Sequence, residues 1–235
     1  MQPHHLILFD IDGTLLNARG AGGRSMQAVA DRLFGNEFTF NGMSFSGKLD
    51  PAIFAEAAHR NQLDDHETHH DAFREAYLEQ LKADLARDGH LTVNTLPGVH
   101  ELIDHLHQRQ RERGDVILGL LTGNYAEAAP LKLAAARINL DCFKINAFGD
   151  EGQTRPDLVA LAMTRYTQTL GHPPDPQRII VIGDTPHDID CAKAHRCIAF
   201  AVATGRFNAQ TLRDHGADIV VPDFADPSPL LQLLP

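Results

Sequence analysis

The chain is predicted to fold as an α/β protein, and three patterns carry this prediction. Short aliphatic and β-branched runs alternate with segments of helical periodicity along most of the 235 residues. Some runs, such as "RIIVI", are apolar throughout, which is typical of parallel strands covered by helices on both faces. Acidic and hydroxyl residues follow several runs, where open α/β sheets bind ligands. The expected strands are residues 6–9, 116–121, 143–148, 179–182, 198–203 and 219–221.

A long stretch between the first two expected strands breaks the alternation. Its helical patterns cover residues 22–34, 52–61 and 67–87. No convincing strand lies among them, and a single crossover rarely needs so much chain. We therefore predict an all-helical insert at residues 17–91, within a core of residues 1–16 and 92–235. The glycine-rich entry "NARGAGG" and the exit "DGHLTVNTLPG" are suited to act as hinges.

Composition limits the classes of partner. Apolar residues make up 43% of the chain, which predicts a globular protein, and the formal charge of -10 argues against nucleic acid or an anionic membrane as partner. No run is long enough to span a bilayer or to form a signal sequence. The three cysteines form no C-x-x-C pair, so we expect reduced thiols and a cytoplasmic location. No obligate protein partner is indicated.

The first acidic motif follows the first expected strand and reads Asp10-Ile11-Asp12-Gly13-Thr14. Side chains two residues apart in an extended chain point the same way. The two carboxylates could therefore share one metal ion and one reacting phosphorus atom. The alternative is an acidic strand end followed by a Gly-Thr turn.

The string "DIDGT" resembles the first motif of the haloacid dehalogenase superfamily, Asp-x-Asp-Gly-Thr. Similar later motifs follow in order, as "LGLLTGN" with Thr122, "TRPDLV" with Arg155, and "IGDTPHD" with an acidic pair. Phosphoglycolate-phosphatase-like members are the general comparison. The resemblance implies a Rossmann-like, doubly wound parallel sheet with the Asp10 strand near its centre, and it makes the insert a type 1 helical cap.

The resemblance also implies an activity, that of a Mg²⁺-dependent phosphatase acting on a small phosphorylated metabolite. Asp10 would be the nucleophile that forms an aspartyl-phosphate, which requires in-line placement and neutralisation of the phosphoryl charge. Asp12 would protonate the leaving oxygen and then activate water. Its backbone carbonyl would be a metal ligand.

A second acidic pair, Asp184 and Asp188, follows the strand expected at residues 179–182. Clustered carboxylates repel one another unless a hard divalent cation joins them, and oxygen donors suit octahedral Mg²⁺. We assign Asp184 as a direct ligand with Asp10. Asp188 is expected to hold a ligand of the metal in place or to reach the metal through a water molecule, and capping of the next helix is compatible with that role.

The phosphate is expected to bind at Thr122, Gly123 and Asn124, which end a strand and precede a helical pattern. A hydroxyl group and adjacent amides at a helix start favour an anion. An ordinary N-cap turn explains the same residues. Their position in the motif series favours phosphate binding.

The basic residue of the third motif is normally lysine in this superfamily, whereas this chain has Arg155 before Pro156. Arginine keeps the charge but binds phosphate through a planar fork. We favour Arg155 over Lys132, which we place inside a helix with its ammonium group extending to solvent. Arg155 could instead only precede a helix that begins with proline.

The insert should select the substrate, because the core would read only phosphate and metal. Arg24 and Lys48 are the basic residues nearest the expected entry, and either could meet an anionic group or be an ordinary surface charge. The segment 66–70 matches the zinc motif H-E-x-x-H, but it lies in a polar helix start, which solvated histidines explain.

Four alternative functions remain to be weighed. A dehalogenase would leave Asp12, Asp184 and Asp188 unexplained. A phosphonate hydrolase needs a cap lysine that forms a Schiff base, and Lys48 matches only by residue type. A non-catalytic sensor would be expected to lack a core carboxylate. A phosphomutase would keep every core residue, so the sequence alone does not separate it from a phosphatase.

Overall fold

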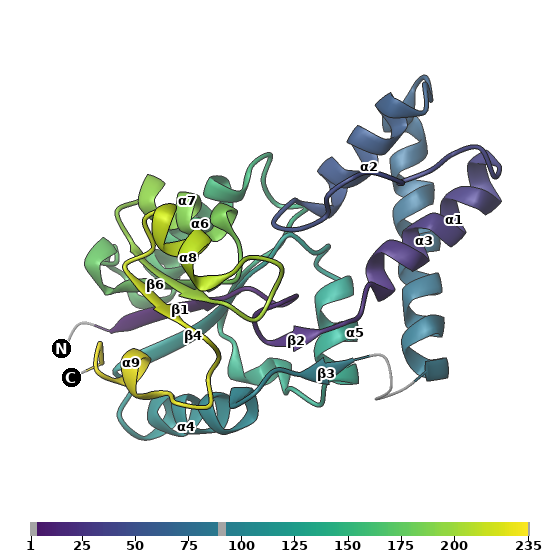
Figure 1. Cartoon of the computed structure of the whole chain (residues 1–235). Coiled ribbons are helices and arrows are strands. Elements are labelled where there is room, and N and C mark those ends of the chain that lie inside the picture. Colours follow the sequence, from purple (N-terminus) through teal and green to yellow (C-terminus); the bar gives the residue numbers. More distant parts are fainter. Residues whose placement is uncertain (1–3, 89–92, 235) are drawn as a thin grey trace.

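The computed structural model describes residues 4–88 and 93–234, and a six-stranded parallel sheet organises it (Figure 1). The strand order is β5-β4-β1-β6-β7-β8, so the strand that precedes Asp10 lies inside the sheet, as predicted. All neighbouring pairs in this sheet are parallel. The strands are β1 (His5–Phe9), β4 (Val116–Leu121), β5 (Ile145–Ala147), β6 (Ile179–Gly183), β7 (Ile198–Val202) and β8 (Ile219–Val221).

Strand β5 is three residues shorter than predicted, and β7 is one residue shorter. The run at residues 143–148 was expected to be extended throughout, but β5 covers only Ile145–Ala147. A 3-10 turn, η2 (Leu140–Cys142), occupies the chain just before it, and the side chain of Asn139 accepts a hydrogen bond from the amide of Asp141 at its start. Phe143 is the C-cap of this turn, and its side chain packs in the core although the residue does not belong to the strand.

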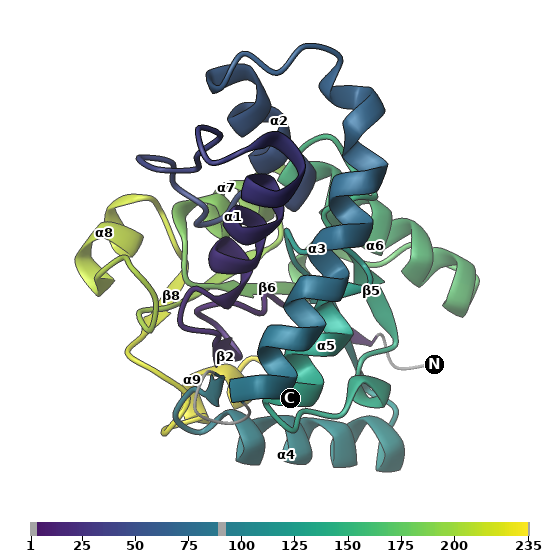
Figure 2. The same ribbon diagram turned by 90° about the vertical axis from the view of Figure 1, so that its right-hand side faces the viewer.

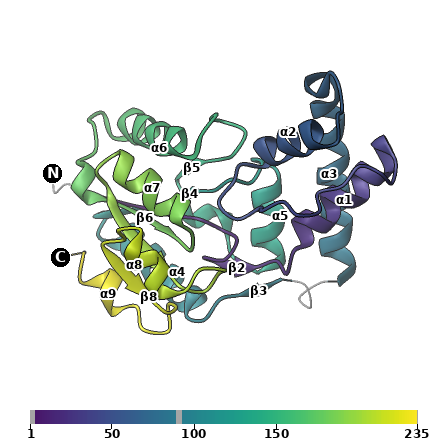
Figure 3. The ribbon, with the colours of Figure 1, turned by 45° about the horizontal axis from the view of Figure 1, so that its top comes forward.

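Alternate residues of β1 serve the two faces of the sheet. Ile7 and Phe9 pack with helices α4 (Val99–Glu112) and α5 (Ala128–Ala135). Leu6 and Leu8 pack on the opposite face, with two buried apolar clusters as the result. Figure 3 shows α6 and α7 on one side of the sheet and α4 and α9 on the other. The remaining helices of this part are α6 (Arg155–Leu170), α7 (Pro186–Ala194), α8 (Ala209–Asp214) and α9 (Ser228–Leu231).

The inserted segment is helical, as predicted. Its helices are α1 (Ala21–Phe34), α2 (Asp50–Arg60) and α3 (His66–Asp88). Phe54 and Phe73 stack with ring centroids 4.3 Å apart, and Phe34 packs against both. The three helices therefore pack their apolar faces together, and this packing is continuous with the apolar cluster that contains Ile7 and Phe9. The helices stand together beside the sheet (Figures 1 and 2).

The base of the insert contains a strand pair that no sequence pattern predicted. Strand β2 (Leu16–Asn17) pairs antiparallel with β3 (Asn94–Thr95), which joins the entry of the segment to its exit. Strands of two residues have no periodicity to detect. The predicted entry boundary at residue 17 falls in β2, whereas the predicted exit boundary at residues 91 and 92 lies outside the described residues.

Polar contacts join the insert to the carboxyl edge of the sheet. The Asp50 amide donates to the Gly123 carbonyl at 2.7 Å, and the Tyr125 amide donates to Asp50 Oδ2 at 3.0 Å. Arg74 of α3 forms ion pairs with Glu127 and Asp150, at 2.7 and 2.6 Å. Among the helices that the structure describes, none is long and apolar enough to cross a membrane.

Candidate active site

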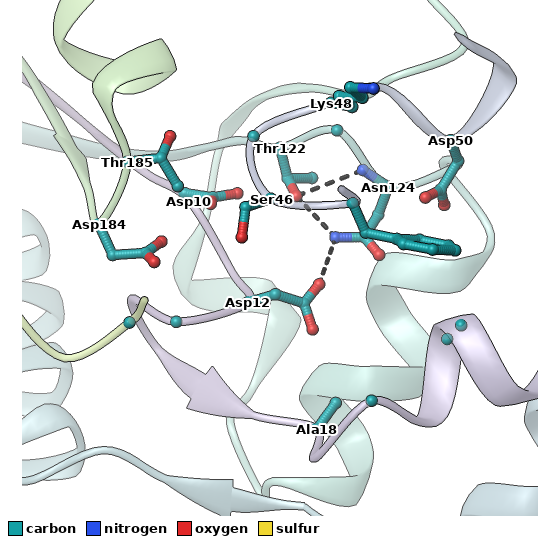
Figure 4. A pocket seen from close by; sticks show the side chains of 18 of the residues that line it. Asp10, Asp12, Ala18, Ser46, Lys48, Asp50, Thr122, Asn124, Asp184 and Thr185 are labelled. Atoms are coloured by element: carbon teal, nitrogen blue, oxygen red, sulfur yellow. Dashed lines mark hydrogen bonds between the residues drawn. The ribbon is translucent and has the colours of Figure 1, made fainter. Parts of the chain in front are cut away.

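A cavity of about 490 Å³ lies between the carboxyl edge of the sheet and the helical insert (Figure 4). We call its sheet side the floor, formed by Asp10, Asp12, Thr122, Arg155 and Asp184. We call its insert side the roof, formed by the lining residues within 17–23 and 45–53 together with Met26 and Tyr77. Strands β1, β4 and β6 are neighbours in the sheet, so residues from distant parts of the sequence meet at the floor.

Gly13 shapes the loop that carries the first motif. Its φ of 84° is in the left-handed region, and a Cβ atom there would lie 2.5 Å from Asp184 Oδ2. The turn places Asp10 in the buried floor, with 6% of its surface exposed. The side chain of Asp12 is 40% exposed and lines the cavity. The two carboxylates therefore have different surroundings, although they look alike in the sequence.

Three buried carboxylates converge beneath the cavity. Asp10, Asp184 and Asp188 each offer one oxygen, and these atoms lie within 4.8 Å of one another. Burial raises the pKa of Asp10 to about 6, against the opposing charge of Arg155. Burial, with the charges of Asp188 and Asp10, raises the pKa of Asp184 to about 8. A hard divalent cation would relieve this crowding, and the oxygen donors suit one.

Asp188 is held by both of its oxygens. Its Oδ2 accepts from the amide and the hydroxyl of Thr185, at 3.0 and 2.7 Å, which closes the capping box of α7. Its Oδ1 accepts from Arg155 Nη2 at 2.5 Å. A Cβ on Gly183 would lie 1.9 Å from Asp188 Cγ, so this packing requires glycine there. Helix capping and a supporting position next to the floor are therefore combined in one residue.

Arg155 provides a buried positive charge in the floor. Its Nη2 lies 3.2 Å from Asp10 Oδ1, and Nη1 donates to the Gly47 carbonyl at 3.3 Å. Burial lowers its pKa, but the neighbouring carboxylates of Asp188 and Asp10 more than offset this, so the pKa is raised. The guanidinium group thus stays charged and bridges the floor to the roof.

Lys132 does not extend to solvent, and that prediction was wrong. Only 4% of the residue is exposed, and Nζ lies 2.6 Å from Asp12 Oδ2. It also donates to Asn124 Oδ1. Helix α3 packs against α5, the helix that carries Lys132, and the lysine side chain lies in the lining of the cavity. Arg155 and Lys132 therefore serve different aspartates of the first motif.

The residues predicted to bind phosphate lie together beside Asp12. Asn124 Nδ2 donates to Asp12 Oδ2 at 2.9 Å and to Thr122 Oγ1 at 2.7 Å (Figure 4). A Cβ on Gly123 would lie 2.1 Å from the Lys48 carbonyl oxygen, so glycine permits the roof to approach. Helix α5 begins only at Ala128, and its N-cap is Glu127. Thr122 therefore does not cap this helix, and the expectation that residues 122–124 lie at a helix start was wrong, while their binding of phosphate stays a prediction.

The two basic residues considered in the insert have different positions. Lys48 lines the cavity, although its ammonium group pairs with Glu56. Arg24 is exposed, donates to the Arg19 carbonyl and does not line the cavity.

Sequence reasoning missed Asp50 and Tyr77 in the roof. Burial raises the pKa of Asp50 to about 7, against the opposing charge of Lys132. The Tyr77 hydroxyl is buried and has no hydrogen-bond partner in the described part of the chain. Asp50 resembles an ordinary acidic helix start before Pro51, and Tyr77 resembles a core aromatic. No local signal separates them from such residues.

The H-E-x-x-H string lies at the start of α3 in the insert. His70 Nε2 lies 3.1 Å from the Tyr125 hydroxyl, and His69 is exposed. Within residues 4–88 and 93–234, the group with metal-ligand spacing is the carboxylate cluster of the floor. The interpretation of these histidines as solvated residues holds for His69, whereas the two histidines of the zinc motif, His66 and His70, are half-buried.

Comparisons with known proteins agree with this architecture. A curated phosphoglycolate phosphatase from Aliivibrio fischeri is 23% identical over 222 residues, covering 93% of this chain and 92% of that protein. CbbY from Rhodobacter sphaeroides, solved with xylulose-1,5-bisphosphate, superposes with a TM-score of 0.72 at 18% identity, over 95% of this chain and 96% of that one. A β-phosphoglucomutase from Clostridium difficile also gives 0.72, at 15% identity, over 98% and 96% of the two chains.

These relatives are too distant in sequence to assign the chain to a family, but a family model does so. The model of the haloacid dehalogenase-like hydrolases matches residues 4–196, which include β1, the insert and all four sequence motifs. That range is most of the chain. The protein therefore belongs to the family of haloacid dehalogenase-like hydrolases.

Proposed function

We propose that this protein is a Mg²⁺-dependent phosphatase that removes phosphate from a small phosphorylated metabolite through an aspartyl-phosphate on Asp10. One observation carries the proposal. The buried carboxylate of Asp10 lies beside the carboxylate of Asp184 and the buried guanidinium group of Arg155, at the floor of the cavity. This arrangement combines a nucleophile with two means of neutralising a phosphoryl dianion. The phosphatase named among the relatives supports it.

The roles follow from position. Asp10 attacks phosphorus, because it is the carboxylate that contacts Arg155 within the cavity. Arg155, Thr122, Gly123 and Asn124 bind the phosphoryl oxygens. Asp10, Asp184 and the Asp12 carbonyl would hold Mg²⁺, which supplies positive charge to the phosphate when bound, and Asp188 supports this set through Arg155.

Asp12 is the candidate for proton transfer. Its side chain is more open to the cavity than that of Asp10, so it can reach an oxygen beyond the phosphorus. It would give a proton to the leaving oxygen and later take one from water. The same residue would therefore serve both halves of the reaction.

Residues 17–91 would act as a cap that reads the remaining part of the substrate. The roof contributes backbone groups of a glycine-rich segment and the side chains of Lys48, Asp50 and Tyr77. Lys48 is the stronger of the two basic candidates for specificity, since Arg24 lies outside the cavity lining. The strand pair β2 and β3 would place the hinge at the base of the insert.

The test is a panel of phosphorylated acids, sugars and nucleotides, assayed with Mg²⁺ for release of inorganic phosphate. We expect activity that disappears with excess EDTA and returns with Mg²⁺. Rapid quenching and peptide mass spectrometry should place a phosphoryl group on Asp10. Full turnover in EDTA, or an adduct on another residue, would contradict the proposal. Phosphate returned to the sugar would identify a phosphomutase instead.

A further inference from the structure

Lys132 is a buried cation to which the catalytic steps above give no role. It lies on α5, is 4% exposed, and contacts Asp12 Oδ2 at 2.6 Å. Removing an ammonium group from water is unfavourable unless the group is paired and hydrogen-bonded. Its pairing with the proton-transfer candidate, and not with Asp10, separates it from Arg155.

The side-chain hydrogen bonds recorded for the Asp12 carboxylate both reach one of its oxygens, Oδ2. Oδ2 receives hydrogen bonds from Lys132 Nζ and from Asn124 Nδ2, at 2.6 and 2.9 Å. Asn124 is held in turn by Lys132 and by Thr122 Oγ1. In the described part of the chain, no donor is recorded on Oδ1. One oxygen is thus anchored by protein, and the other is available on the cavity side.

We propose that Lys132 is a positioning residue that orients Asp12 for proton transfer, an inference that rests on the proposed function. An aspartate with 40% of its side chain exposed has several accessible rotamers, and proton transfer requires one that directs Oδ1 to the leaving oxygen. A misplacement of about 1 Å at such a group can cost about 10²-fold in rate. Fixing Oδ2 from the side leaves Oδ1 in one place.

A purely structural ion pair would have different consequences. Its loss would lower stability and reduce all steps alike. Loss of a positioning contact should instead affect the steps that need a proton transferred. These are departure of a basic alkoxide and attack of water on the aspartyl-phosphate, whereas p-nitrophenolate leaves with little help.

The experiment compares Lys132→Met with wild type, and uses Lys144→Met, at an exposed lysine of the core, as the matched control. We expect Asp10 to be phosphorylated from p-nitrophenyl phosphate within about threefold of the wild-type rate, and kcat/KM for an alkyl phosphate to fall about 10²-fold. Hydrolysis of the phosphoenzyme should also slow. An equal loss with both substrates would overturn the proposal.

A double-mutant cycle gives a second readout. In the Asp12→Asn background, Lys132→Met should cause no further loss with the alkyl phosphate, because its effect passes through Asp12. Full additivity would contradict this. Lys132→Gln, which keeps a hydrogen-bond donor, serves if the methionine variant does not fold. Failure of the proposed function would look different, since wild type itself would then form no phosphoenzyme.

Discussion

The floor and the roof of the cavity are built in different ways. The floor contains buried charges that hold one another, and Arg155 pairs there with both Asp10 and Asp188. The roof consists of glycine backbone, apolar side chains and a few polar groups, of which Lys48 is 30% exposed and Tyr77 has an unpaired hydroxyl. Mutually fixed charges suit a reaction that tolerates little displacement. A less constrained roof suits recognition of the variable part of a substrate.

Floor variants should therefore lose activity with every substrate, whereas roof variants should lose activity with some substrates only.

The largest effect is expected at Asp10. Asp10→Asn replaces the attacking oxygen by a poor nucleophile, so kcat should fall by about 10⁴-fold or more with every phosphate ester, and no phosphoenzyme should form. Stopped assays of phosphate release and rapid-quench mass spectrometry would measure both. Asp141→Asn, at an exposed position, is the control. Near-normal turnover of Asp10→Asn would show that Asp10 is not the nucleophile.

Arg155→Ala should lower kcat by about 10²-fold to 10³-fold, the range for loss of one preorganised charge-stabilising donor. The loss should be similar for all substrates. The melting temperature should also fall, because Asp188 and Asp10 lose a buried partner. Lys193→Ala, which breaks an exposed ion pair with Asp218, should change kcat less than about twofold. A loss that depends on the substrate would show that Arg155 recognises the variable part of the substrate, and not the phosphoryl group alone.

Tyr77→Phe tests the roof. The buried hydroxyl has no partner in the described residues, so its removal should leave the melting temperature unchanged or slightly higher. If the hydroxyl forms a hydrogen bond to the substrate, kcat/KM for the preferred ester should fall about tenfold, which corresponds to the loss of one hydrogen bond. The kcat/KM for p-nitrophenyl phosphate should stay unchanged. Steady-state kinetics on both substrates would show the difference. A uniform loss would indicate that the roof also supports the chemistry.

The smallest effect concerns stability and pH without metal. The raised pKa values of Asp10, Asp50 and Asp184, about 6, 7 and 8, mean that the folded state binds protons more tightly than the unfolded chain, where aspartate has a pKa of about 3.9. This contribution is complete below about pH 4 and is lost as pH rises toward 8. The melting temperature in EDTA should therefore decline over that range.

Asp184→Asn should make this decline shallower, by a few degrees, since about 1 kcal/mol shifts the melting temperature of such a chain by about 2–4 °C. Calorimetric scans at several pH values would measure it. Asp141→Asn should keep the wild-type slope. An unchanged slope in Asp184→Asn would show that the floor carboxylates are not crowded in the way described.

Much of the fold followed from local patterns. The strands and the three helices of the insert were placed correctly to within a few residues, because burial on both faces or on one helical stripe leaves a periodic signal. The short strands β2 and β3 and the turn η2 were not predicted. Elements of two or three residues are too short to leave a periodic pattern in the sequence. The convergence of Asp10, Thr122 and Asp184 was predictable from strand ends that share one edge of a parallel sheet.

The sequence by itself therefore determined the sheet, the helical insert and the acidic floor. Only the tertiary structure decided that Lys132 points to Asp12 and that Asp50 is buried. It also decided that the two oxygens of Asp188 accept hydrogen bonds from Thr185 and Arg155. Lys132 and Asp12 are 120 residues apart, and no local pattern encodes a contact of that range. A lysine in a helix usually extends its ammonium group to solvent, whereas here Nζ is buried against Asp12 and Asn124, on a helix that packs against α3.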